Sequence, residues 1–189
     1  AYDLTFNGVP KQFTCILELT SPHRSYETMK LTTEVDVRSL TALQINSKID
    51  SPVGQYGINL QHRGNRQAFE SSVAVTTPHE PYSKFSCGMT FNLSPIIRLN
   101  GEITSSVPGY ERMNLAIEHE GRYDGFRTSA ESTTSIRGFN TFGASVEHKH
   151  TGGSQNLKTI ISVRTPVRGH ETYTLTTEKT GDISDFMTK

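Results

Sequence analysis

The amino-acid sequence predicts an all-β protein: an antiparallel meander of about a dozen amphipathic strands that forms a large, one-sided, curved sheet. Apolar and polar residues alternate over many short segments, which is the pattern of a half-buried strand. No window sustains the three- and four-residue apolar spacing of a helix. Only 33% of the 189 residues are hydrophobic, which suits a sheet that needs apolar residues on one face only.

A turn-and-strand unit of roughly 29 residues recurs along the chain. Prolines that follow Ser, Thr or Val mark its turns, at Pro22, Pro52, Pro78, Pro108 and Pro166, and a similar turn at Ser135–Phe139 lacks the proline. An aromatic residue or histidine follows each turn, and an outgoing strand begins shortly after it. The outgoing strands are predicted at Met29–Leu31, Ile58–Leu60, Phe85–Phe91, Met113–Ile117, Phe142–Val146 and Tyr173–Leu175.

Return strands are predicted after polar or Gly-rich reversals such as Arg63–Asn65 and Thr151–Ser154. Short connections make neighbouring strands antiparallel, and proline fits at strand ends because it cannot donate to a central ladder. The whole chain, residues 1–189, is therefore predicted to be a single sheet module. The return strands include Phe13–Leu19, Phe69–Val75, Leu99–Ile103 and Leu157–Val163.

Composition argues against several classes of function. The net charge is +0 and no basic patch is visible, so nucleic acid is not an expected partner. No apolar window approaches the length of a membrane-spanning helix, and the first residues do not resemble a signal peptide. Cys15 and Cys87 match no metal spacing. In a simple meander these cysteines lie about 24 Å apart, too far for a disulfide with each other.

The apolar side of such a sheet needs a cover. Each apolar side chain contributes roughly 1.5–3 kcal/mol when it leaves water, so a strand with three or four of them leaves about 5–10 kcal/mol unrealised on a wet face. Large exposed apolar patches mark ligand or partner sites. The sheet could roll into a barrel, fold into a sandwich, or lie against lipid or another chain. The low hydrophobic content favours the last arrangement.

The repeat also resembles a known family. A turn such as Val107-Pro108-Gly109-Tyr110-Glu111, followed by alternating apolar residues, is similar to the amphipathic β-strand region of large lipid transfer proteins, which include apolipophorins, vitellogenins and apolipoprotein B, and is most similar to invertebrate apolipophorins. The likeness covers nearly the whole chain in short degenerate copies, in one of which His170 replaces the aromatic residue. It implies a fragment of a much larger secreted lipoprotein precursor in extracellular fluid, with bound lipid and with other segments or subunits of that precursor as partners in an oligomer.

The predicted function is binding and transport of lipid or another apolar ligand, including a carotenoid-like pigment, by burial rather than catalysis. No phosphate loop, zinc-protease motif or nucleophile elbow occurs, so neither an enzyme nor a catalytic cofactor is expected. The alternatives are an assembly module whose apolar face packs on another subunit, and a transmembrane β-barrel, which also alternates but usually has aromatic girdles. The expected ligand-binding residues are Phe85, Met89, Phe91, Leu93, Met113, Leu115, Ile117, Phe142 and Val146.

Three further features are interpreted as structural or solvated. His148 and His150 share a strand face and could join a metal site, but no third ligand is evident, so no metal is predicted. Glu118, His119 and Glu120 are interpreted as solvated charge. The residues that follow the turns are expected to pin each turn to its strand, or alternatively to form a rim around a ligand.

One modification site is possible. Asn92-Leu93-Ser94 is an N-glycosylation sequon. The alternation places Asn92 on the polar face, opposite Phe91 and Leu93, where a sugar could be accommodated. Pro95 directly after the sequon weighs against its use.

Overall fold

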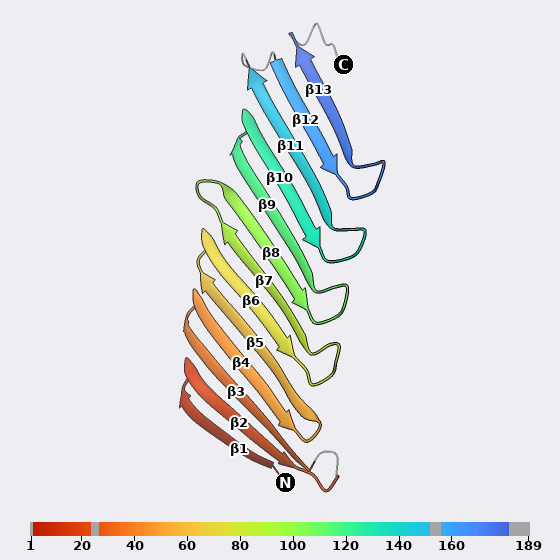
Figure 1. Ribbon diagram of the computed structural model, residues 1–189. Helices are drawn as coiled ribbons and strands as arrows, with labels where there is room; N and C mark the ends of the chain where they lie inside the picture. Colours follow the sequence, from red (N-terminus) through yellow and green to blue (C-terminus); the bar gives the residue numbers. More distant parts are fainter. Residues whose placement is uncertain (1, 24–26, 152–155, 182–189) are drawn as a thin grey trace. The chain divides into compact units, whose positions relative to one another are not determined.

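The computed structural model describes residues 2–23, 27–151 and 156–181, and all regular secondary structure in these ranges is β-strand (Figure 1). The strands follow one another in the sheet in sequence order, from β1 to β13, and every pair whose register is defined is antiparallel. The predicted all-β antiparallel meander is therefore confirmed. The strands are β1 (Tyr2–Val9), β2 (Gln12–Thr20), β3 (Thr28–Ser39), β4 (Ala42–Ser51), β5 (Gly54–Gly64), β6 (Ala68–Thr76), β7 (Lys84–Asn92), β8 (Ile97–Ser105), β9 (Arg112–Arg122), β10 (Gly125–Thr134), β11 (Thr141–Thr151), β12 (Asn156–Arg164) and β13 (Thr172–Thr180).

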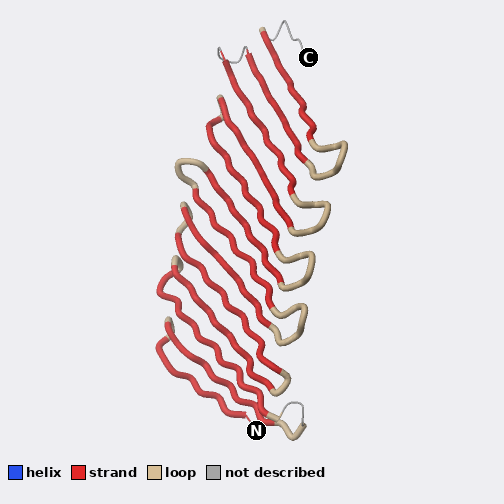
Figure 2. Tube along the Cα trace, viewed as in Figure 1, coloured by secondary structure: helices blue, strands red, loops and turns tan. Residues whose placement is uncertain are grey.

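Figure 2 shows strands joined by short loops, without helix in the described residues. Accordingly, no helix long and apolar enough to cross a membrane occurs in that part of the chain. The chain divides into two compact units. We call them the amino-terminal unit, Ala1–Thr90 with Glu102–Glu111, and the carboxy-terminal unit, Phe91–Gly101 with Arg112–Lys189.

In the amino-terminal unit, the register aligns apolar residues across six strands. Leu17 pairs with Leu4 on one side and with Leu31 on the other. Further along, Ile45 pairs with Leu60, which in turn pairs with Val73. Because directly paired residues lie on the same face of a sheet, this register places the apolar alternates of β1–β6 on one face.

The carboxy-terminal unit has the same construction from β9 to β13. One row of paired residues runs from Ile117 through Ala130 and Ala144 to Val163 and Tyr173. The neighbouring row on the same face consists of His119, Thr128, Val146, Ile161 and Leu175. The apolar face of this unit therefore contains more small and hydroxylated residues than that of the amino-terminal unit.

The turns at one end of the strands are closed by a recurring hydrogen bond. The backbone N–H of Thr77 donates to the carbonyl of Ser83, six residues later, at 2.9 Å. The Thr77 hydroxyl also donates to the carbonyl of Tyr82 at 2.7 Å. The same N–H to carbonyl bond closes the turns that begin at Ser21, Ser105, Thr134 and Thr165, and the hydroxyls of Thr134 and Thr165 make the equivalent side-chain bond.

This geometry corrects the interpretation that all five prolines mark the same position of the same turn. Pro22, Pro78 and Pro166 directly follow the Ser or Thr that opens the loop, whereas Pro108 lies two places later than they do. Pro52 lies in a different, two-residue turn between Ser51 and Gly54. Two features define the loop: a Ser or Thr whose hydroxyl is hydrogen-bonded, and an aromatic residue or histidine five places later. The turn after Thr134 has both features, which explains why it forms without proline.

Glycines at the opposite end of the strands allow three tight reversals. Gly8, Gly64 and Gly121 have φ values of 129°, 116° and 107°, a region that side chains disfavour. Each pairs across the hairpin with a phenylalanine, at Phe13, Phe69 and Phe126 respectively. A Cβ atom on Gly64 would lie 2.5 Å from the Cα of Phe69 and 2.2 Å from the carbonyl oxygen of Ala68, so glycine is required there.

We expect Gly64→Ala to lower the free energy of unfolding by about 1–3 kcal/mol, because it combines a positive φ with a steric clash. Urea unfolding followed by far-UV circular dichroism would measure the change. Gly88→Ala is the matched control in β7, since nothing lies within 4 Å of its added Cβ. Equal effects of the two substitutions would contradict this account of the reversal.

Candidate functional site

The candidate site is the apolar face of each unit. In the amino-terminal unit this face presents Leu, Ile, Val, Met and aromatic side chains from β1 to β6, whereas the opposite face presents mainly acidic, basic, amide and hydroxyl groups. Ile16 is an exception, since its pairing with Thr5 and Thr32 places it on the polar face. The separation of the two faces follows directly from the two-residue repeat of a strand.

No described part of the chain covers these apolar faces. None of the described residues is buried. Leu4 and Ile58 in the amino-terminal unit are 63% and 53% exposed, and Leu175 in the carboxy-terminal unit is 60% exposed. Single exposed apolar residues are ordinary, but contiguous apolar patches mark a binding surface.

The predicted ligand-binding residues divide into three groups. Met113, Leu115 and Ile117 alternate along β9, and the register through β10 places Phe142 and Val146 of β11 on the same face. Leu115 and Phe142 are both paired with Ser132.

The second group lies on β7, where Phe85, Met89 and Phe91 occupy alternate positions. Leu93 forms the third group alone, because β7 ends at Asn92 and Leu93 lies in the following turn. The binding role of all these residues stays a prediction.

Several polar groups on the apolar faces are paired with one another. A 3.0 Å hydrogen bond joins the hydroxyls of Thr33 and Ser47, and a 2.7 Å bond joins His62 Nδ1 to the Ser71 hydroxyl. In the carboxy-terminal unit, His119 Nδ1 bonds Thr128 and His148 Nδ1 bonds Thr159, each at 2.8 Å. An apolar ligand could cover these pairs at little cost, because their polar atoms do not lose their partners.

A ten-residue motif behind these pairs was missed in the sequence. His62, Gly64, Phe69 and Ser71 share their spacing with His119, Gly121, Phe126 and Thr128. Phe6, Gly8, Phe13 and Cys15 repeat the spacing with phenylalanine in the first position. In each copy the phenylalanine packs beside the first residue, with ring centroids 5.0–5.9 Å apart. The repeated spacing alone would have revealed this motif.

The residues after the turns stack on the strands that follow. Phe139 stacks on Phe142 with ring centroids 6.1 Å apart, and His170 stacks on Tyr173 at 6.0 Å. These contacts support the interpretation that the turn residues pin the turns.

The structure also places the predicted glycosylation site and the two cysteines. Asn92 is exposed at the end of β7, and its Oδ1 accepts a 3.0 Å hydrogen bond from the Ser94 N–H. Both cysteines are free, and their strands, β2 and β7, are five places apart in the strand order. The glycosylation of Asn92 stays a prediction.

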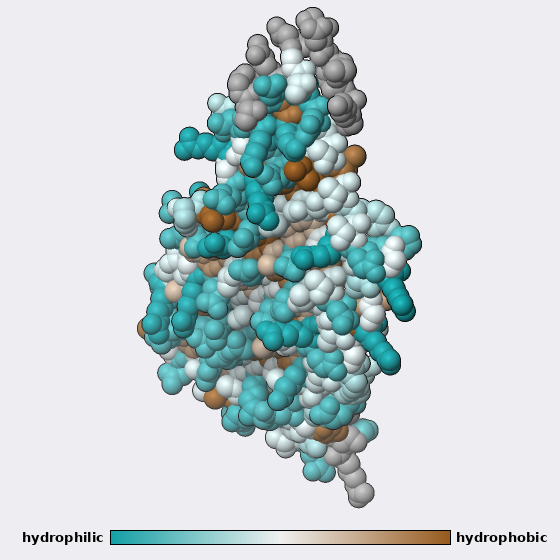
Figure 3. Space-filling view, turned by 45° about the horizontal axis from the view of Figure 1, so that its top comes forward, coloured by the Kyte–Doolittle hydropathy of each residue, from teal (hydrophilic) through white to brown (hydrophobic). Residues whose placement is uncertain are grey.

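The polar faces contain cross-strand ion pairs. Glu18 and Lys30 are directly paired on β2 and β3, with Oε1 and Nζ 2.7 Å apart, and this hydrogen bond raises the pKa of Lys30. Arg164 of β12 reaches Glu131 of β10 at 3.3 Å, across Gly143. In the view of Figure 3, hydrophilic residues predominate and hydrophobic residues are scattered among them. Exposed pairs of this kind contribute little stability, and they keep a face hydrated.

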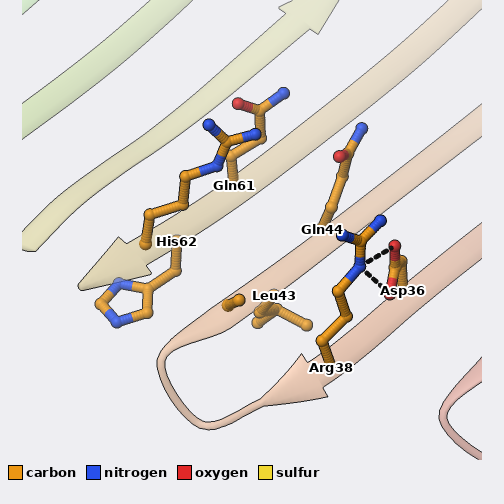
Figure 4. Close-up of a pocket in the computed structure, with 8 residues that line it drawn as sticks. Asp36, Arg38, Leu43, Gln44, Gln61 and His62 are labelled. Atoms are coloured by element: carbon orange, nitrogen blue, oxygen red, sulfur yellow. Dashed lines mark hydrogen bonds and ion pairs between the residues drawn. The ribbon is translucent and has the colours of Figure 1, made fainter. Parts of the chain in front are cut away.

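A hollow of about 350 Å³ on the polar side is lined by residues of β3, β4 and β5. Figure 4 shows Asp36 joined to Arg38, and it shows Gln61 and His62 on opposite sides of β5. The Arg38 Nε lies 3.0 Å from the Asp36 carboxylate, so the Asp36 carboxylate in this hollow already forms an ion pair. Within the described residues, no group of three or more potential metal-binding side chains occurs.

Comparisons with known proteins add no assignment. No family model, no curated protein and no solved structure matches the chain. The functional argument therefore depends on the geometry of the two faces.

We expect Lys149→Gln to raise the pKa of Glu147 toward its usual value of 4.5, because the hydrogen bond from Lys149 is the main cause of its lowered pKa. The lowered pKa means that Glu147 stabilises the fold above the unfolded-state pKa, and that this contribution is lost as the pH falls through the folded-state pKa. Carboxyl NMR titration measures the shift. Lys158→Gln serves as the control and should have a smaller effect, since Lys158 acts only through weak long-range attraction; an unchanged pKa in Lys149→Gln would contradict this explanation.

Proposed function

We propose that the apolar face binds lipid or another apolar molecule, and that the chain belongs to a larger secreted lipid carrier. The observation that supports binding is the exposure of ordered apolar residues, such as Ile58 and Leu175, on one face of a hydrogen-bonded sheet. The larger secreted carrier is supported only by the resemblance of the turn-and-strand repeat to large lipid transfer proteins.

The mechanism of binding is removal of apolar surface from water. Each square ångström of apolar surface that the ligand covers contributes about 25 cal/mol. This driving force has no preferred direction, so the face should accept several apolar molecules of suitable size. The mutual hydrogen bonds of His62 with Ser71 and of Thr33 with Ser47 reduce the desolvation penalty of covering the polar groups on this face.

The direct test is extraction of the native protein with organic solvent, followed by mass spectrometry of the extract. A stoichiometric lipid or carotenoid-like compound is the expected result, and it would identify the ligand. Extracts free of apolar compounds, from a protein that forms stable oligomers, would favour the assembly module, in which another apolar sheet covers the face.

We expect Leu115→Asp to lower lipid retention strongly, because it places a charge in the middle of the apolar face. Leu115 is 40% exposed, so its replacement should leave the fold intact. Asn114→Asp is the matched control, since Asn114 is adjacent on β9 but lies on the polar face, where its amide donates to Thr133. Lipid retained per protein, measured after gel filtration with phospholipid vesicles, compares the variants. Unchanged lipid retention by Leu115→Asp would contradict the proposed site.

A further inference from the structure

Three of the loops share one backbone geometry around a glycine. They are residues 105–111 between β8 and β9, residues 134–140 between β10 and β11, and residues 165–171 between β12 and β13. Gly109, Gly138 and Gly169 have φ values of 84°, 85° and 84°. In each loop the N–H of the residue after the glycine donates to the carbonyl three residues before it, at 2.9–3.0 Å. The three loops can therefore be compared position by position.

In two of these loops a glutamate of the loop itself occupies the glycine amide. The Gly109 N–H donates to Glu111 Oε1, and the Gly169 N–H donates to Glu171 Oε1, each at 2.8 Å. The backbone amides of Gly169 and of Glu171 itself lower the pKa of the Glu171 carboxyl, so they favour its charged form. This loop geometry therefore holds an oxyanion with backbone donors.

Loop 134–140 has the same geometry without the internal anion. Asn140 stands at the position that Glu111 and Glu171 occupy in the other loops. The Thr134 N–H still donates to the Asn140 carbonyl at 2.9 Å, so the loop is closed in the same way. Among the described residues, however, no group accepts the N–H of the exposed Gly138. The amide that binds a carboxylate in the other two loops is open here.

A guanidinium adjoins this open amide. Arg137 directly precedes Gly138 and is exposed, and it has no hydrogen bond or ion pair with the described part of the chain. Glu131 on β10 is already paired with Arg164 at 3.3 Å, and Glu171 in the neighbouring loop is held by the amide of its own loop. A backbone amide beside an arginine suits an oxyanion with several oxygens, such as a phosphate.

The apolar face of the carboxy-terminal unit begins beside this loop. Phe139 is exposed, and its ring stacks on Phe142 with centroids 6.1 Å apart. From Phe142 the same side of β11 continues through Ala144 to Val146, a distance of about 13 Å for four residues of strand. Ile161 lies beside Val146 on β12. An anion bound at loop 134–140 therefore has apolar surface next to it, as the head of an amphiphile requires.

We propose that loop 134–140 binds the phosphate group of a phospholipid, with the Gly138 N–H and Arg137 as donors and an acyl chain on the apolar face from Phe142 toward Val146. This inference rests on the proposed function and adds a head-group site to it. The acyl chain supplies apolar burial, and the phosphate receives charge-assisted hydrogen bonds, which are about twice as strong as neutral ones.

Binding of dioctanoyl phosphatidate, of dioctanoylglycerol and of inorganic phosphate to the full chain tests the proposal. Amide NMR spectroscopy, below the aggregation concentrations of the two lipids, follows the signal of Gly138. We expect phosphatidate to shift this signal and to bind about tenfold more tightly than dioctanoylglycerol, because only phosphatidate forms charge-assisted hydrogen bonds. Inorganic phosphate should bind more weakly than phosphatidate, since it has no acyl chain to bury.

Substitutions in the loops separate the contributions. Asn140→Glu should abolish the preference for phosphatidate, because the new carboxylate can occupy the Gly138 amide as Glu171 occupies that of Gly169. The pKa of the new carboxyl, measured by NMR titration, should then be lowered as that of Glu171 is, which distinguishes occupation of the amide from charge repulsion. Arg137→Gln should reduce the preference. Arg168→Gln is the matched control and should retain it. Far-UV circular dichroism verifies that each variant folds.

Each contrary result has a distinct meaning. Equal binding of phosphatidate and dioctanoylglycerol would overturn the head-group site and leave the proposed lipid-binding function in place. Failure of both lipids to bind would contradict that function together with this inference. Equal affinities for inorganic phosphate and phosphatidate would indicate a site for free phosphate instead. In the folded Asn140→Glu variant, an unchanged preference for phosphatidate would exclude the Gly138 amide, and a normal carboxyl pKa would contradict the equivalence of the loops.

Discussion

The alternation of side chains along hydrogen-bonded antiparallel strands is the constraint on which the rest of the structure depends. Directly paired residues share a face, so the register that pairs Leu17 with Leu31 also aligns the apolar residues of the other strands. No described residue is buried, so order within each unit comes from backbone ladders and cross-strand contacts instead of an enclosed core. The hydrophobic free energy that a core would use in folding therefore remains available for binding.

The two faces differ mainly in the charge of their polar groups. On the polar face, charged pairs such as Glu18 with Lys30 are open to water and screened by it. On the apolar face, polar groups bond one another over short distances, as His119 does with Thr128. Only the second arrangement tolerates an apolar cover, because an unpaired polar group loses its water when it is covered. The pairs on the apolar face are therefore compatible with the binding proposed for that face.

Much of the fold could be predicted from local pattern, and the exceptions have physical causes. Strands such as β9 were evident because Met113, Leu115 and Ile117 alternate with polar residues. The β10 strand was not, since Thr128, Ala130 and Ser132 occupy its apolar-face positions. Its strand character depends on pairing with β9 and β11, which a local pattern does not reveal.

The candidate site could be predicted only in part. The shared face of His148 and His150 followed from their spacing, but His119 was interpreted as solvated charge because Glu118 and Glu120 flank it. Its proximity to Phe126 requires the exact register of β9 with β10, and a shift of one residue would move it to the other face. The turns were misinterpreted for a related reason, since proline was the visible marker whereas the hydroxyl of Thr134 closes the loop.

An apolar surface can hold a ligand but cannot orient it, because burial has no direction. Orientation requires a polar group at a fixed place, held by partners that do not depend on the ligand. Thr159 holds the ring of His148 in this way, and Phe126 packs against it. On this face, His148 lies toward the glycine end of β11, whereas Val146 and Phe142 lie further along the strand. In the proposed carrier, the apolar residues would supply affinity, and polar groups held in this way would supply orientation.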